Sequence, residues 1–240
     1  MIREFAKETD ARLAKKMPVL PEIPFTAEES KELKRLGEIL STAAVEAHAK
    51  GGVTLTTNLS DRVGKFVLQS VAPIKQREFL AEMALGYLIS YLEAFIKDYI
   101  LQILVANPRM LRSNATMTFE DVITHKSMKA LRSAVAEKEV ESLGYGSIDE
   151  VATYFQKKLN ISLTTFPQWQ ELREHVFRRN LIVHNKARVN ETYRRKVAYT
   201  GKAVHISTDM LYVEAAAARM LEFMEFVHTE TSKKLKLDET

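Results

Sequence analysis

Hydrophobic positions recur with a helical period along most of the 240-residue chain. The longest periodic segment runs from about residue 75 to residue 106, where large apolar side chains return every three or four residues and form a broad arc on a helix. Asn107 and Pro108 end this segment. Because the whole chain has only eight glycines and six prolines, the pattern predicts an all-α fold, an up-and-down helical bundle in which strands are minor.

Shorter helices are predicted on both sides of the long segment. Thr26 and Glu29 form a capping box, which places the start of a helix that extends to about Lys50. Asn190 is expected to cap a short helix in NETYRRK, and VAYTGKAVHIS after it is expected to form a loop or short hairpin. The other helices are expected over residues 2–17, 127–143, 147–159, 167–187 and 209–231.

The chain is expected to contain one main domain with an extension. Residues 1–58 are interpreted as an N-terminal helical extension and linker, residues 59–232 as the helical domain, and residues 233–240 as a charged tail. The boundary is placed in GGVTLTTNLSD because this segment is polar and turn-like.

The composition is typical of a soluble protein, with 46% hydrophobic and 28% charged residues. No uninterrupted apolar run approaches the roughly 18 residues that a membrane span needs. The chain has no cysteine, so it lacks thiolate metal sites and fits a reducing cytoplasm. A net charge of +4 permits an anionic partner such as RNA. We therefore expect a soluble, cytoplasmic protein without a membrane partner.

The stretch RRNLIVHN, which begins at Arg178, combines polar and apolar residues near the end of a predicted helix. At about 100° per residue, Asn180, Arg173 and His184 project as a narrow polar stripe between two apolar strips. Arg179 lies at the edge of the same arc, and Arg178 faces away as a charge suited to an RNA backbone. Because an unpaired buried polar group costs about 1–3 kcal/mol, the stripe needs partners, a water-filled cleft or a ligand.

Two readings of this stripe stay open from the residues alone. Asn180 and His184 could simply bond to another helix, which is the usual fate of a histidine on an apolar face. However, eight basic residues are concentrated in and around the stretch, as is typical of a surface that binds phosphates. Tyr193 and Tyr199 beside them could stack on unpaired bases or pack on the surface. The eight basic residues are Arg173, Arg178, Arg179, Lys186, Arg188, Arg194, Arg195 and Lys196.

The stretch RRNLIVHN resembles the signature of the HEPN superfamily. The members are small helical bundles whose motif is an arginine, four to six residues and then a histidine, often with a polar residue after the arginine. Arg179, Asn180 and His184 match that pattern. The segments YLISYLEAFIKDYI, EVESLGYGSIDEV and RVNETY are also similar to a prokaryotic branch near the RiboL-PSP-HEPN group. The resemblance covers about residues 60–232 and implies a HEPN-like bundle.

The resemblance implies a metal-independent endoribonuclease of a prokaryotic defence or toxin–antitoxin system. In that chemistry His184 takes the 2′-hydroxyl proton or protonates the leaving 5′-oxygen, for which an imidazole is suited. Arg179 would stabilise the charge of the transition state, and Asn180 would orient the phosphate or the imidazole. The products would carry a 2′,3′-cyclic phosphate and a 5′-hydroxyl. No metal or other cofactor is implied, and the six histidines form no HxxxH or HExxH pair.

Helix geometry separates Arg179 from His184. The two residues lie about 140° and about 7.5 Å apart on an ideal helix, so they do not share a face. Because HEPN-like domains usually pair their motif helices across a shared cleft, the resemblance implies a homodimer with a composite site. An antitoxin or another defence-system protein is a further possible partner.

Asp98 and Arg173 are weaker candidates for a supporting role. Asp98 projects onto the apolar face of the long helix, between Tyr87 and Tyr91. Asp98 could pair with Arg179 or Arg173 or orient His184, but the preferred interpretation is that a tyrosine hydroxyl or a basic residue of another helix satisfies it.

Two further functions share the predicted fold. A non-catalytic HEPN-like module could bind RNA or nucleotide, or could serve as a dimerising partner. A structural helical adaptor could instead bury the motif helix within one monomer and leave no cleft beside His184.

Overall fold

The computed structural model of the chain describes residues 24–50, 60–111, 118–143 and 147–235, together with residues 4, 8, 11, 12 and 15. Most of the helix predicted over residues 2–17 lies outside these residues. Most of the GGVTLTTNLSD boundary and the last five residues of the charged tail also lie outside them.

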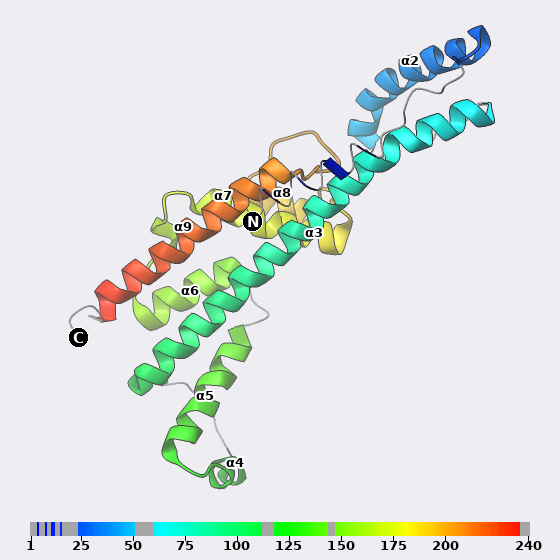
Figure 1. Cartoon of the computed structure of the whole chain (residues 1–240). Helices are drawn as coiled ribbons and strands as arrows, with labels where there is room; N and C mark the ends of the chain where they lie inside the picture. The colour runs from blue at the N-terminus through cyan, green and yellow to red at the C-terminus, as the bar shows by residue number, and fades with distance from the viewer. Residues whose placement is uncertain are drawn as a thin grey trace. The chain divides into compact units, whose positions relative to one another are not determined.

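The chain is all-α, as predicted (Figure 1). Within the described residues, backbone pairing of the strand type is confined to one isolated antiparallel bridge between Arg188 and His205. The helices are α2 (Ala27–Lys50), α3 (Asp61–Ala106), α4 (Phe119–Thr124), α5 (Met128–Leu143), α6 (Ile148–Leu159), α7 (Trp169–Asn185), α8 (Glu191–Val197) and α9 (Met210–Leu235), with short 3-10 turns at Pro108–Met110 and Leu163–Thr165.

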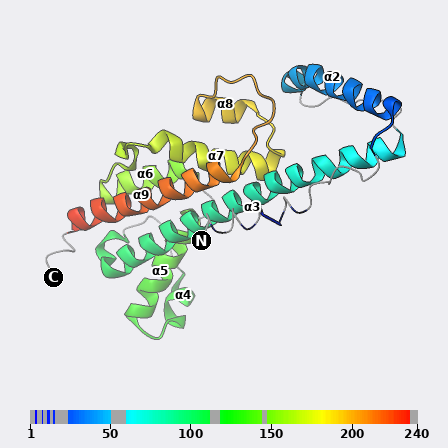
Figure 2. The same cartoon turned by 45° about the horizontal axis from the view of Figure 1, so that its top comes forward.

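The capping box at the start of α2 is confirmed. The Thr26 amide donates to the Glu29 carboxylate at 2.8 Å, and the Glu29 amide donates to the Thr26 hydroxyl at 3.2 Å. Glu29 also pairs with Arg62 at 3.3 Å, and the rings of Phe25 and Phe66 meet edge to face at 5.3 Å. These contacts join α2 to the first turns of α3, and the two helices lie side by side in both views (Figures 1 and 2).

Helix α3 begins 14 residues earlier than the hydrophobic pattern predicted. The added segment contains Pro73, and a proline inside a helix removes a backbone hydrogen bond. The helix nevertheless runs from Asp61 to Ala106 with Pro73 inside it, and both views draw α3 as one helix (Figures 1 and 2). Val63 and Pro73 are both buried, so burial of the first turns offsets the bond lost at the proline.

By length and composition, α3 could cross a membrane. An 18-residue window in it has a mean hydropathy of 1.5, and 28% of that window is buried. The buried positions Ala81, Leu85, Ile89 and Leu92 recur every three or four residues, which is also the pattern of a core helix in a soluble protein. The helix is therefore compatible with a soluble protein.

The chain forms two compact units, and their boundaries fall inside α3, α7 and α9. Unit 1 comprises Met1–Gly86 and Glu174–Ala218, and unit 2 comprises Tyr87–Arg173 and Arg219–Thr240. This division differs from the domains predicted at residues 1–58, 59–232 and 233–240, because contacts group segments that are distant in the sequence.

Each unit has a core of its own. In unit 2 the rings of Phe166 and Trp169 contact that of Phe223, with centroids 5.4 and 6.0 Å apart. In unit 1 the buried residues Leu181, Tyr193 and Ile206 form one cluster. The RRNLIVHN stretch belongs to unit 1.

Candidate functional site

The motif helix α7 ends directly after the motif. Lys186 and Ala187 adopt left-handed φ values of 52° and 58°, a conformation that costs non-glycine residues about 1 kcal/mol or more. The Lys186 amide donates to the Ile182 carbonyl and the Ala187 amide to the Leu181 carbonyl, both at 3.1 Å. These bonds satisfy the last helical carbonyls and turn the chain back towards α8.

The end of α7 buries one of its two apolar strips and exposes the other. Leu181 lies in the cluster with Tyr193 of α8 and Ile206. Val183, on the other strip, is 59% exposed, and His184 beside it is exposed. His184 therefore does not lie on a buried face, because α8 and the segment around residue 206 cover only one side of the helix end.

The three motif residues lie at or near this open surface. Arg179 and Asn180 are half-buried. The guanidinium of Arg179 donates to the side-chain oxygen of Asn180 at 2.8 Å. A guanidinium, an amide and an imidazole can all donate to a phosphate. The arrangement leaves the His184 ring accessible to a large ligand.

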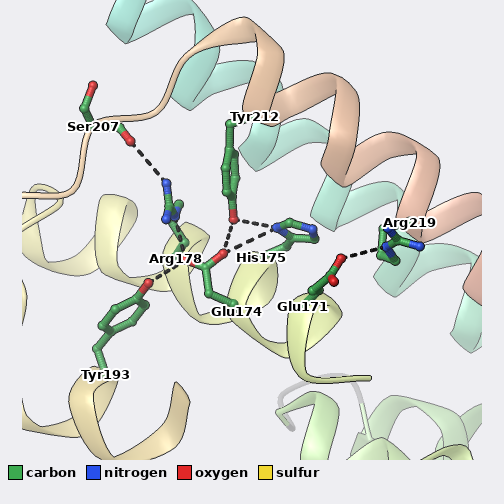
Figure 3. A network of polar contacts seen from close by, with 8 residues as sticks. All are labelled: Glu171, Glu174, His175, Arg178, Tyr193, Ser207, Tyr212 and Arg219. Carbon is green, nitrogen blue, oxygen red and sulfur yellow. Dashed lines mark hydrogen bonds and ion pairs between the residues drawn. The ribbon is translucent and has the colours of Figure 1, made fainter. Parts of the chain in front are cut away.

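Glu174, five residues before Arg179, is the centre of a partly buried polar network that the motif did not predict (Figure 3). Its carboxylate accepts from the hydroxyl of Tyr193 at 2.5 Å, from Nε of Arg178 at 2.7 Å and from the hydroxyl of Tyr212. Tyr193 belongs to α8 and Tyr212 to α9. The carboxylate therefore joins three helices of unit 1.

Arg178 and His175 complete the network (Figure 3). Arg178 lies with its guanidinium 3.9 Å from the ring centre of Tyr212 and donates to the Ser207 carbonyl at 3.1 Å. Its side chain is only 15% exposed. Nδ1 of His175 lies 2.5 Å from the Tyr212 hydroxyl, and because that hydroxyl donates to Glu174, His175 donates to the tyrosine oxygen. The same nitrogen lies 3.5 Å from a carboxylate oxygen of Glu174, so its N–H is shared between the two. The expectation that Arg178 faces away as a backbone-contacting charge is wrong.

The network sets the ionisation of its members. Burial alone would raise the pKa of Glu174, but the hydrogen bond from His175, the charge of Arg178 and the two tyrosine hydroxyls lower it to about 2. Burial raises the pKa of Tyr193 and of Tyr212, and the carboxylate raises both further. Both hydroxyls therefore keep their protons and act as donors.

The folded chain is expected to lose about 3 kcal/mol of stability as the pH falls from about 5 to about 2. The pKa of Glu174 is lowered from 4.5 to about 2 on folding, so protons bind the unfolded chain more strongly in this window. The stabilisation is complete above pH 4.5 and is lost as the pH falls through the folded pKa. Urea unfolding at several pH values measures it, and Glu174→Gln should lack this part of the curve. Parallel curves for the two proteins would contradict it.

Arg173 and Asp98 both lie outside unit 1. Arg173 donates to both carboxylate oxygens of Asp149, at 2.7 and 3.1 Å, and to Gln170 at 2.9 Å, so these bonds join α7 to α6. Asp98 is exposed. The interpretation of Asp98 as an acid on a buried face is wrong, because the stripe of α3 that carries it also carries Tyr87, which is 74% exposed.

The predicted RNA-binding residues divide into two groups. Lys186, Arg188 and Arg195 are exposed. Arg194 donates to the Gly201 carbonyl at 2.7 Å, and the ammonium of Lys196 lies 5.7 Å from the ring centre of Phe177. These last two charges hold the local structure in addition to any ligand they bind.

Tyr193 and Tyr199 differ in their surroundings. Tyr193 is 3% exposed and bonded to Glu174, so its ring does not offer a stacking surface. Tyr199 is half-buried, with the guanidinium of Arg194 5.4 Å from its ring centre. The packing alternative therefore holds for Tyr193.

Among the residues that the structure describes, no group of three or more His, Cys, Asp or Glu side chains could hold a metal ion. Two surface pockets in the described part of the chain have volumes of about 320 and 310 Å³, and His184 lines neither.

Sequence reasoning missed Glu174, His175 and Tyr212. The sequence does carry one signal, because Glu174 and Arg178 are four residues apart and can pair on a helix. The two tyrosines come from α8 and α9, and no local pattern relates them to Glu174. Comparison of the chain with known protein families, with curated proteins and with solved structures gives no match.

Proposed function

We propose that the chain is a HEPN-like, metal-independent endoribonuclease that cleaves RNA as a homodimer. The observation that supports this most strongly is the exposure of His184 in the last turn of α7. Leu172, Val176 and Leu181 of the same helix are buried. An imidazole exposed on a helix that is otherwise largely covered suits a group that has to reach a ligand.

His184 and Arg179 have separate tasks in the proposed reaction. An imidazole removes the proton of the ribose 2′-hydroxyl, the 2′-oxygen attacks the phosphorus, and the bond from phosphorus to the 5′-oxygen breaks. The leaving 5′-oxygen takes up a proton, which gives a 2′,3′-cyclic phosphate and a 5′-hydroxyl. Arg179 donates to the phosphate oxygens as their negative charge grows. Asn180 already bonds to Arg179 and orients it.

The reaction needs two proton transfers, and one motif supplies one histidine. Since α7 is a regular helix through Asn185, Arg179 and His184 keep the separation of about 140° that an ideal helix gives. A second copy of the chain, placed with its motif helix facing the first, provides the second imidazole and brings an arginine to each histidine. Val183, an exposed apolar residue beside His184, is suited to such a contact.

The exposed charges at the end of α7 fit the same proposal. Lys186, Arg188 and Arg195 are exposed in unit 1, and positive charges attract the phosphates that flank the cleaved bond. A cytoplasmic toxin or defence nuclease would use such a surface, with an antitoxin or another defence-system protein as a further partner.

A non-catalytic RNA-binding module is the second candidate function. It is supported by the exposed side chains of Lys186, Arg188 and Arg195, which can hold phosphates whether or not a bond is cleaved. It shares the exposed basic residues with the ribonuclease, and only turnover separates the two functions.

Incubation of the purified chain with total RNA in EDTA tests the proposed function. We expect cleavage, products with 2′,3′-cyclic phosphate and 5′-hydroxyl ends, and a dimer in light scattering at micromolar concentration. Cleavage by a monomer would contradict the composite site. Binding of RNA without cleavage would favour the non-catalytic module.

A further inference from the structure

A histidine that the motif does not contain lies at the end of the motif helix. The bridge between Arg188 and His205 is flanked by two backbone bonds, from the Val189 amide to the Val204 carbonyl at 2.8 Å and from the Ile206 amide to the Ala187 carbonyl at 3.0 Å. In this pattern the bridged residues are a non-hydrogen-bonded antiparallel pair. Their side chains therefore leave the same face, with Cβ atoms about 5 Å apart.

The backbone on both sides of the pair is held in place. The side-chain amide of Asn185 donates to the Arg188 carbonyl at 2.5 Å. The loop that carries His205 is fixed by the bond from Arg194 to the Gly201 carbonyl, and Gly201 lies so close to Tyr199 that an added Cβ would meet the ring at 2.4 Å. The backbone positions of the two residues are therefore set before any ligand binds.

Both side chains of the pair are exposed. Exposed Lys186 precedes Arg188 by two residues, and exposed Lys202 precedes His205 by three. Glu82 of α3 is an acidic group whose charge interacts with His205, and burial followed by the charge of Glu78 raises the pKa of Glu82. With their Cβ atoms about 5 Å apart, the guanidinium of Arg188 and the imidazole of His205 can converge on one tetrahedral anion.

We propose that Arg188 and His205 together bind one phosphate of a single-stranded RNA, beside the bond that the motif would cleave. This inference rests on the proposed function for the identity of the ligand, but it assigns a role to His205 and requires no catalysis. It differs from the general basic surface because it predicts that the two side chains act on the same phosphate.

A double-mutant cycle tests the pair. The probe is a fluorescent single-stranded 2′-O-methyl oligonucleotide, which the proposed chemistry cannot cleave because the 2′-oxygen is blocked. We expect Arg188→Ala and His205→Ala each to weaken binding about tenfold, the value of one charge-assisted hydrogen bond. The double variant should lose far less than the hundredfold product, because the two contacts share one phosphate. Arg188→Ala should also reduce the slope of log affinity against log salt by about 0.7.

Arg132→Ala is the matched control, since Arg132 is an exposed arginine on α5 and should bind the oligonucleotide as the wild type does. The shared phosphate site would be overturned if the loss of affinity in the double variant equalled the product of the two single losses, or if the single variants bound normally. Either result would leave the ribonuclease proposal intact. If the two variants showed the coupled loss of affinity but the wild-type chain cleaved no RNA, the phosphate site would be supported and the catalytic proposal would be refuted. Wild-type protein that does not bind the oligonucleotide would overturn both.

Discussion

Replacement of His184 by alanine is expected to lower the rate of RNA cleavage by about 10²- to 10⁴-fold, the usual contribution of a general acid or base. The imidazole is exposed, so its loss removes no core contact and should leave the unfolding curve unchanged. The measurement is the single-turnover cleavage rate of a short RNA in EDTA. Affinity for the 2′-O-methyl oligonucleotide should stay within about twofold of wild type, since proton transfer contributes little to binding.

His228→Ala is the matched control. His228 is also exposed, lies on α9 in unit 2 and contacts Tyr99, with ring centres 6.1 Å apart. Its variant should cleave RNA at the wild-type rate. Equal rates for the wild type and His184→Ala would refute the assignment of His184. Arg179→Ala is expected to lower the cleavage rate by about 10²- to 10³-fold, the usual effect of losing one donor to a transition-state oxyanion.

Replacement of Glu174 by alanine is expected to lower the free energy of unfolding by about 3–5 kcal/mol. The change leaves the guanidinium of Arg178, 15% exposed, without its carboxylate, and it removes the acceptor of the Tyr193 and Tyr212 hydroxyls. An unpaired buried charge is among the costliest defects in a folded protein. Urea denaturation followed by circular dichroism measures the loss.

Glu171→Ala provides the control on the same helix. Glu171 pairs with Arg219 at 3.0 Å, but its side chain is 60% exposed, so its loss should cost less than about 1 kcal/mol. Equal losses of unfolding free energy in Glu174→Ala and Glu171→Ala would show that the network stabilises the chain no more than an exposed ion pair does. Glu174→Gln keeps the shape and should cost less than Glu174→Ala, because its amide still offers an oxygen to a tyrosine.

Local sequence patterns predicted the features that depend on interactions between residues close in the sequence. The caps at Thr26 and Asn190 were found because the capping side chain and its amide are three residues apart. The start of α3 was wrong because the apolar arc begins near residue 75, whereas the helix already begins at Asp61 and contains Pro73. The two compact units could not be predicted, since each joins segments that are distant in the sequence.

The candidate site shows the same limit at the level of side chains. Projection on an ideal helix identifies which residues share a face, but it does not tell which face a neighbour covers. The face around Phe177 and Leu181 is covered by α8, whereas Val183 and His184 remain exposed. The role of Arg178 depends on Tyr212 and Ser207, about 30 residues later, and no spacing in the sequence contains that information.

The partly buried network fixes the rotational setting of α7 about its own axis. Glu174 and Arg178 are held from α8 and α9, and each residue along the helix turns by about 100°. One residue inserted between Arg178 and Arg179 would leave the held part in place and swing the motif by about 100°. The two adjacent arginines are thus not equivalent. Arg178 helps to fix the rotation of α7 about its axis, and this rotation determines the directions in which Arg179 and His184 point.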